Sequence, residues 1–255
     1  MPIGFMDSGL GGLSVLREAM RIMPYEDFIY YGDSKNAPYG TKSADEIRAL
    51  TFHVVEYLLA RGIKGLAVAC NTATSAAVRR LREMYPYLPI VGIEPAIKPA
   101  AVNSRGGRVI VMATPMTIQQ PKFHALLDRY KHMAEIVPVK CGGLMEYVEQ
   151  GNLDGKELDA YFREHLSPFL TANTETIVLG CTHYPFLKPH LREFLANDSI
   201  KLIDGSYGTS KELMRQLKEK GLLHEAPRER SIEIENSSPD PKMIELSWHL
   251  LRMPA

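Results

Sequence analysis

Residues 65–76 read GLAVACNTATSA, an apolar run followed by a cysteine and small polar residues. The apolar part is typical of a strand buried on both faces of a parallel sheet. Residues 176–186, TIVLGCTHYPF, repeat this order of apolar run, small residue, cysteine and polar residues. This repeated pattern predicts two related halves facing each other, each with a cysteine where a strand gives way to a helix.

Working outward, short apolar runs alternate with amphipathic segments along the chain. This alternation predicts an α/β protein with mainly parallel sheets. The predicted strands are Ile3–Met6, Phe28–Tyr31, Gly65–Ala69, Arg108–Met112, Thr176–Leu179 and Lys201–Ile203. The predicted helices are Asp45–Ala60, Ser75–Met84, Gln119–Tyr130, Lys156–Leu170 and Lys211–Lys220. Ser43 and Glu46 predict a capping box at the start of the first of these helices.

Turn-forming residues interrupt the pattern around residues 95–107 and again around 204–208. We therefore expect residues 1–95 plus 205–255 to form an N-terminal α/β lobe. Residues 96–204 are expected to form a C-terminal α/β lobe.

Composition excludes several classes of function. Thirty Lys and Arg residues balance thirty Asp and Glu residues, so no net charge favours nucleic acid or a membrane surface. The start, MPIGFMDSG, lacks the charged segment of a signal peptide, and the apolar runs are too short to span a bilayer. Three cysteines without a CxxC pair indicate free thiols in a reducing cytoplasm and disfavour a thiol-redox protein.

Polar clusters follow the predicted strands at the edge where parallel sheets bind ligands. The clusters are Asp7-Ser8-Gly9, Pro38-Tyr39-Gly40, Cys70-Asn71-Thr72, Ala113–Thr117 and Cys181-Thr182-His183. One such cluster is a weak signal, but their repetition predicts a small-molecule site.

Cys70 and Cys181 are the strongest candidates within these clusters. A free cysteine is commonly a buried, inert hydrophobe. A thiol near a helix N-terminus, however, has a lowered pKa and serves as a base near neutral pH. We therefore expect these two thiols to act as opposed proton carriers on one small substrate. Cys141 lacks such a strand lead-in and is expected to be structural.

The neighbours of the thiols have two readings each. Asp7 is either a turn or N-cap residue, or a carboxylate that relays a proton beside one thiol. A lone histidine is usually a surface or satisfied core residue, but the position of His183 in its cluster favours a role beside the other thiol. Neutral donors at strand ends are suited to a carboxylate substrate; they are Ser8, Asn71, Thr72 and Thr182. Thr114 and Thr117 either add to this set or are simple turn residues.

The sequence contains no complete motif for binding a cofactor or a metal ion. The loop Gly9–Gly12 with Asp33 suggests dinucleotide binding, but Ser14 stands where a third glycine is needed. Lys35, considered for pyridoxal phosphate, lies in a polar turn, and Cys181 with His183 lacks further metal ligands. No cofactor and no metal are expected.

Six segments in order resemble glutamate racemase over nearly the whole chain: IGFMDSGLGGLSVLRE, YYGDSKNAPYGTKS, VACNTATSAA, VGIEPAIKPA, VMATPMTI and VLGCTHYPFL. The resemblance implies a cofactor-independent isomerase that supplies D-glutamate for peptidoglycan, in cell wall biogenesis and cell shape. It implies two pseudo-symmetric lobes with the active site in the cleft between them, and a homodimer.

For individual residues, the resemblance makes Cys70 act on D-glutamate and Cys181 on L-glutamate, assisted by Asp7 and His183. The implied substrate contacts are Asp7, Ser8, Tyr39, Gly40, Asn71, Thr72, Thr114, Thr117, Thr182 and His183. Glu149 matches an acidic catalytic position. Residues 139–149, VKCGGLMEYVE, depart from the family's more usual Cys-Pro and Val-Pro.

Two rival functions follow from the same residues. An aspartate or other amino-acid racemase would use the same chemistry with a different side-chain pocket. A non-catalytic carboxylate-binding or interaction protein would keep the polar clusters without the turnover.

Overall fold

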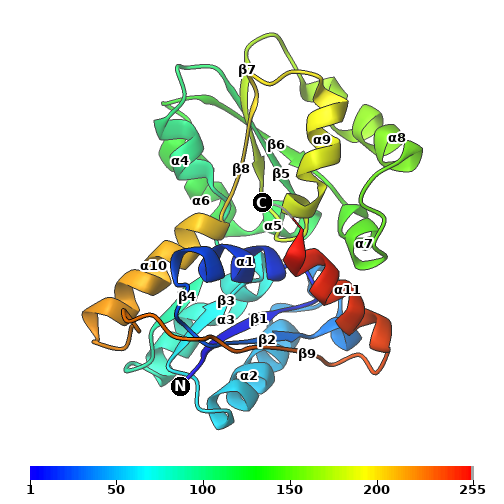
Figure 1. Ribbon diagram of the computed structural model, residues 1–255. Coiled ribbons are helices and arrows are strands. Elements are labelled where there is room, and N and C mark those ends of the chain that lie inside the picture. The colour runs from blue at the N-terminus through cyan, green and yellow to red at the C-terminus, as the bar shows by residue number, and fades with distance from the viewer. Residues whose placement is uncertain (254–255) are drawn as a thin grey trace. The chain divides into compact units, whose positions relative to one another are not determined.

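The computed structural model describes residues 1–253 and divides into two α/β units, each built on its own parallel sheet (Figure 1). Unit 1 combines Met1–Glu94 with the described residues from Ser206 onward, and unit 2 is Pro95–Gly205. The expected α/β class, with parallel sheets flanked by helices, is confirmed.

The sheet of unit 1 has five strands in the order β4-β3-β1-β2-β9, all parallel. The strands are β1 Ile3–Asp7, β2 Phe28–Gly32, β3 Gly65–Val68, β4 Ile90–Gly92 and β9 Ile232–Asn236. The chain runs from β1 to β2 on one side and places β3 on the other side of β1. The strand order therefore reverses between β1 and β3, where open α/β sheets bind ligands.

Helices cover both faces of this sheet. In Figure 1, α1, α10 and α11 lie on one face, and α2 and α3 lie on the other. Their bounds are α1 Leu13–Ile22, α2 Ala44–Ala60, α3 Asn71–Met84, α10 Ser206–Glu219 and α11 Pro241–Arg252. Two 3-10 helices, η1 Ser34–Asn36 and η2 Tyr39–Thr41, follow β2. A buried apolar cluster joins α2 and α3 to the sheet and includes Met6, Val54, Leu66 and Val78.

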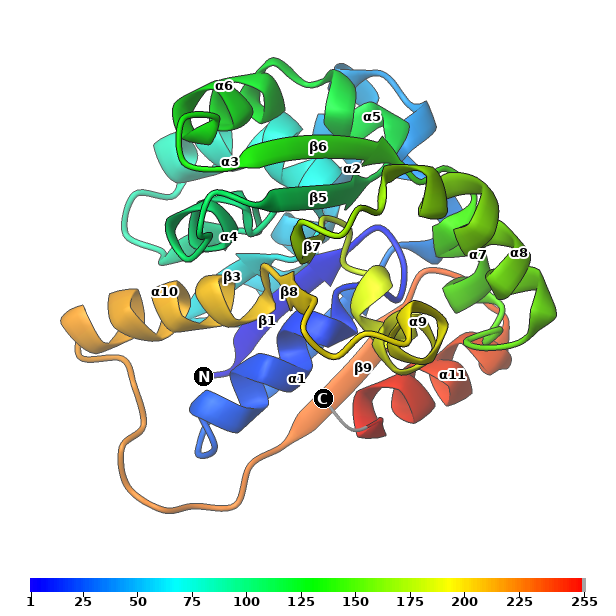
Figure 2. The ribbon, with the colours of Figure 1, turned by 90° about the horizontal axis from the view of Figure 1, so that it is seen from above.

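A buried ion pair holds the long connection between α10 and β9, which Figure 2 shows as an extended loop. Lys64 Nζ lies 2.6 Å from Oε2 of Glu26, and both side chains are almost fully buried. The same ammonium donates to the carbonyl of Leu222 at 2.7 Å, and Glu26 accepts from the amide of His224 at 2.6 Å. The pair therefore ties the connection to the sheet.

The sheet of unit 2 has four parallel strands in the order β6-β5-β7-β8. They are β5 Arg108–Ala113, β6 Glu135–Lys140, β7 Thr174–Leu179 and β8 Lys201–Asp204. Here the strand order reverses between β5 and β7. The carboxyl ends of these two strands are therefore the counterpart of the ends of β1 and β3 in unit 1.

The helices of unit 2 also form two layers, with α4 and α6 on one face and α8 and α9 on the other (Figure 1). Their bounds are α4 Ile97–Val102, α5 Pro115–Gln119, α6 Pro121–Tyr130, α7 Leu144–Glu149, α8 Lys156–His165 and α9 Lys188–Leu195. The 3-10 helices are η3 Ser167–Phe169 and η4 Tyr184–Leu187. Phe162 of α8 packs its ring 5.3 Å from that of Phe194 in α9.

All six predicted strands are present, with ends shifted by at most two residues. The helix predicted at Ser75–Met84 begins earlier, at Asn71. Pro121 separates α5 from α6 within the segment predicted as one helix, and Pro168 lies in a 3-10 turn where the helix from Lys156 was expected to continue. The capping box of Ser43 and Glu46 is present in both directions.

No helix in residues 1–253 is both long and apolar enough to cross a membrane.

Candidate active site

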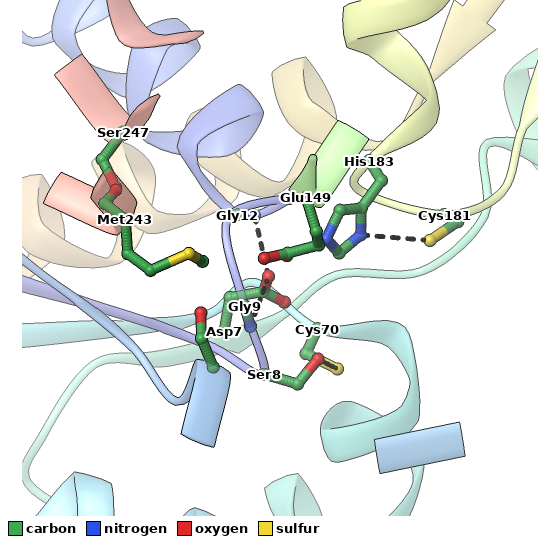
Figure 3. A network of polar contacts seen from close by, with 12 residues as sticks. Asp7, Ser8, Gly9, Gly12, Cys70, Glu149, Cys181, His183, Met243 and Ser247 are labelled. Atoms are coloured by element: carbon green, nitrogen blue, oxygen red, sulfur yellow. Dashed lines mark hydrogen bonds and ion pairs between the residues drawn. The ribbon is translucent and has the colours of Figure 1, made fainter. Parts of the chain in front are cut away.

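Cys70 is the N-cap of α3, directly after strand β3. Its Sγ atom accepts the backbone N–H of Ala73 at 3.5 Å. The Oγ atom of Ser8, from the end of β1, lies 3.5 Å from the same sulfur (Figure 3). The amide and the positive end of the helix both favour a thiolate over a thiol. The predicted position of Cys70 at a helix N-terminus is confirmed.

Asp7 is fully buried at the end of β1 and organises the loop that follows. Its Oδ2 atom accepts the backbone N–H groups of Gly9 at 3.2 Å and Gly12 at 3.0 Å (Figure 3). A Cβ atom on Gly12 would lie 2.7 Å from the Cβ of Asp7, so only glycine lets α1 start this close to the strand. Asp7 therefore fills the loop-capping role that the sequence left open. The next residue, Ser8, places its hydroxyl against the Cys70 sulfur.

Tyr39, from the loop after β2, is buried in the same unit. Its hydroxyl donates to Oδ2 of Asp33 at 2.7 Å, and Asn36 donates to the same carboxylate. Burial, the bond to Asp33 and the nearby charges of Cys70 and Asp7 raise the pKa of Tyr39, so the phenol is a neutral donor. Gly40 follows in the 3-10 helix. Asp33, weighed in the sequence as a dinucleotide ligand, instead holds this tyrosine.

Asn71 and Thr72 form the first turn of α3, and both are half-buried. The Oδ1 atom of Asn71 is buried and has no hydrogen-bond partner in the described chain. A polar atom left in this way costs free energy unless a ligand or water binds it. The Oδ1 atom of Asn71 is therefore available to a hydrogen-bond donor from a ligand or from water.

In unit 2, Cys181, His183 and Glu149 form a line of contacts (Figure 3). Sγ of Cys181 lies 3.6 Å from Nδ1 of His183, and Nε2 of His183 lies 2.6 Å from Oε1 of Glu149. Cys181 is half-buried, whereas the side chain of His183 is only 2% exposed. His183 thus lies beside Cys181, as predicted. Glu149 contacts the opposite side of the His183 ring, although residues 139–149 depart from the usual family sequence.

The charge state of His183 follows from these contacts. Burial by itself lowers its pKa, but hydrogen bonds and charges from Cys181 and Glu149 outweigh burial and raise the pKa well above 6.5. In that state the ring donates one N–H to the carboxylate of Glu149 and the other to the sulfur of Cys181. Cys181 thus has a different hydrogen-bond partner from Cys70.

One expectation about Cys181 is wrong. Residues 181–183 form a turn, and the four-residue 3-10 helix η4 precedes α9, so Cys181 does not open an α-helix. Prolines at 185 and 189 lack the N–H that a continuous helix would need as it extends. Only Cys70 therefore lies at the N-terminus of an α-helix. The sulfur of Cys181 contacts the imidazole of His183 instead.

The remaining predicted residues of unit 2 divide into two groups. Thr182 is buried beside Cys181. Thr114 is the N-cap of α5, accepting the N–H of Thr117 at 3.2 Å, and the two hydroxyls lie 2.9 Å apart. The pair therefore caps a helix, the simpler of the two readings that the sequence allowed.

Cys141 is buried after β6, and burial raises the pKa of its thiol to about 12. A neutral, enclosed thiol is a poor base. This agrees with its predicted structural role. Its carbonyl accepts the hydroxyl of Tyr184, which the sequence did not single out, although Tyr184 lies within the quoted 176–186 segment.

Comparison with known proteins gives consistent results. Residues 8–207 match the family model described as Asp/Glu/Hydantoin racemase. A glutamate racemase of Clostridium botulinum is 51% identical over 252 residues, covering 99% of this chain and 97% of that protein.

Solved structures agree. A glutamate racemase from Francisella tularensis in complex with D-glutamate has a TM-score of 0.83 at 30% identity, covering 99% of this chain and 94% of that one. An Escherichia coli glutamate racemase with L-glutamate and the activator UDP-MurNAc-Ala has a TM-score of 0.81 at 30% identity, covering 98% and 94%. On this evidence the chain belongs to the Asp/Glu/Hydantoin racemase family, a family of isomerases.

Proposed function

We propose that this chain is a glutamate racemase that interconverts L- and D-glutamate without a cofactor. The observation that carries the proposal is the full-length identity of 51% to a glutamate racemase. Related enzymes at 30% identity bind D-glutamate and L-glutamate in their solved structures.

The proposed mechanism uses Cys70 and Cys181 as the two acid–base groups. Racemisation removes the α-proton from one face of the carbon and returns a proton to the other, which a single base reaches with difficulty. One thiolate takes the proton while the other thiol donates, and the roles exchange with the handedness of the substrate. Cys70 acts on D-glutamate and Cys181 on L-glutamate.

The residues that contact each sulfur support the proposal that both cysteines act as acid–base groups. The amide of Ala73 and the hydroxyl of Ser8 stabilise the thiolate of Cys70. His183, backed by Glu149, does so for Cys181. Only a thiolate can accept the α-proton, so a contact that stabilises the thiolate increases the share of each sulfur that can act as the base at neutral pH. Asp7 is proposed to assist Cys70 through the loop that it organises.

The substrate's carboxylates are proposed to bind to neutral donors rather than to arginine. The amide of Asn71 stands at the N-terminus of α3, with Thr72 beside it, and anions are favoured at such helix ends. Ser8, Tyr39, Gly40, Thr182 and His183 complete the proposed contacts. Thr114 and Thr117 contribute less directly, since their hydroxyls already cap α5.

Purified protein with L-glutamate, followed by chiral chromatography, tests the proposal. D-glutamate should accumulate to the racemic ratio, and Cys70→Ser and Cys181→Ser should each lower kcat/KM by about 10²–10⁴-fold, the usual contribution of an acid–base group. Absence of D-glutamate, or racemisation by the double variant, would overturn it. The variants' circular dichroism spectra provide the control for folding.

A second candidate is racemisation of aspartate or another amino acid, since the matching family model spans several substrates. Parallel assays with L-aspartate and neutral amino acids separate the two. A kcat/KM for aspartate above that for glutamate would favour this candidate. Exchange of the α-proton with deuterated solvent separates both from a protein that binds carboxylates without turnover.

In the cell, the proposal assigns the chain to the cytoplasm, where it supplies D-glutamate for peptidoglycan. A homodimer is proposed as its working state. Light scattering of the purified protein tests that state: twice the chain mass of 28.6 kDa supports the dimer, and the single mass contradicts it.

A further inference from the structure

The turn between β6 and α7 determines where Glu149 lies, because Glu149 is the last residue of that short helix. The turn is built from Cys141, Gly142 and Gly143. Gly143 has φ 81°, in the left-handed region that glycine adopts freely. Two adjacent glycines have few conformational restraints of their own, so the direction of α7 depends on other contacts.

Two tyrosine hydroxyls supply such contacts by binding consecutive carbonyls of the turn. The hydroxyl of Tyr184 donates to the carbonyl of Cys141 at 2.7 Å. The hydroxyl of Tyr161, from α8, donates to the carbonyl of Gly142 at 2.9 Å. Tyr184 is 1% exposed, and its ring is held within the core of unit 2.

Tyr184 also belongs to the loop that carries the histidine. It directly follows His183, and its backbone N–H donates to the carbonyl of Cys181 at 3.1 Å. One side chain thus connects the loop of Cys181 and His183 with the turn that leads to Glu149. Tyr161 also contacts α7 directly, with its ring 6.2 Å from that of Tyr147 in α7.

We propose that Tyr184 and Tyr161 are positioning residues, whose hydroxyls fix the 141–143 turn and so keep Glu149 against His183. This proposal rests on the proposed function only for its effect on turnover. Neither hydroxyl is assigned a contact with the substrate. Both act through Glu149.

Several ionisable groups face the residues of this contact. His183 faces Cys181 on its own loop and Glu149 on α7. Tyr184 faces Cys181, Cys141, Tyr161 and, from α7, Glu146. Burial keeps both phenols protonated by raising their pKa values, so each remains a hydrogen-bond donor at neutral pH.

Nuclear magnetic resonance of the His183 ring tests the positioning without requiring any turnover. In ¹⁵N-histidine-labelled protein, the ring of His183 is assigned by comparison with His183→Gln. Tyr184→Phe and Tyr161→Phe should each lower the pKa of His183, in the same direction as Glu149→Gln. Unchanged titration in both tyrosine variants would overturn the proposal. If Tyr184→Phe does not fold, Tyr161→Phe alone decides.

Kinetics supply the second test. Tyr184→Phe should lower kcat/KM for glutamate by about 10–100-fold, as expected when a group that orients a catalytic side chain is lost. The double variant Glu149→Gln, Tyr184→Phe should be no slower than Glu149→Gln alone, because the hydroxyl acts through Glu149. Losses that multiply would overturn the proposal.

Tyr130→Phe is the matched control. Tyr130 ends α6 in the same unit and is also buried. Its variant should leave both the His183 titration and kcat/KM unchanged, and an effect equal to that of Tyr184→Phe would contradict a specific role. If the wild-type protein does not racemise glutamate, the proposed function fails while the titration still tests the positioning.

Discussion

Nε2 of His183 lies 2.6 Å from Oε1 of Glu149, and Nδ1 of the same ring lies 3.6 Å from Sγ of Cys181. When this ring is protonated, it donates one N–H to the carboxylate and the other to the sulfur. The sulfur of Cys70, in the other unit, contacts the N–H of Ala73 and the hydroxyl of Ser8. The two candidate bases thus have different hydrogen-bond partners.

Glu149→Gln should lower the pKa of His183. Burial disfavours the protonated imidazole, and the variant removes the carboxylate charge that counteracts burial. The basic limb of the pH profile of kcat/KM should consequently move to lower pH. Enantiomers have equal free energies in water, so kcat/KM must fall equally for L- and D-glutamate. Only kcat and KM individually can differ between the two directions.

Rates measured from pH 6 to 10 with both enantiomers check this prediction, with Glu146→Gln in α7 as the control. A basic limb that stays in place would contradict it. The charged contact also stabilises the fold: its contribution is present in full below 6.5 and is lost as pH rises through the raised pKa.

Cys141 should be the least reactive thiol of the folded protein. With a pKa of about 12, it is almost entirely protonated at pH 8, and only the thiolate is alkylated. Iodoacetamide labelling followed by peptide mass spectrometry should modify Cys181 well before Cys141. In urea, both should react at similar rates. Equal rates in the folded protein would contradict the burial assigned to Cys141.

Lys64→Met should destabilise unit 1 strongly. It leaves the buried carboxylate of Glu26 without its cation, a change that costs about 3–5 kcal/mol. Urea unfolding measures the loss, and adding Glu26→Gln should recover part of it. Lys131→Met, which breaks an exposed pair with Asp128, should have no measurable effect.

The inner strands were predictable because they are continuously apolar and buried on both faces. The three strands that the sequence did not reveal, β4, β6 and β9, are all at sheet edges. β6 contains Pro138, which an edge strand tolerates, and β9 alternates polar and apolar residues, IEIEN. An edge strand has one neighbour and needs less apolar surface, so its signal is weak.

Some residues of the candidate site were also predictable from the sequence, and others were not. Residues adjacent to a strand end, such as Cys70 and His183, were predictable because position along the chain sets position at the sheet edge. Contacts made by residues of other elements, such as the hydroxyl of Tyr161 on the carbonyl of Gly142, were not predictable. Those contacts depend on tertiary packing, and no local pattern records them.

The most direct test of the two-thiol mechanism is racemisation of protiated L-glutamate in D₂O, analysed at low conversion. With two bases, the D-glutamate formed should carry solvent deuterium at Cα, while the remaining L-glutamate stays largely protiated. The reverse reaction should give the mirror result. A product that retains the original α-proton would show that a single base carries it across, and would contradict the roles assigned to Cys70 and Cys181.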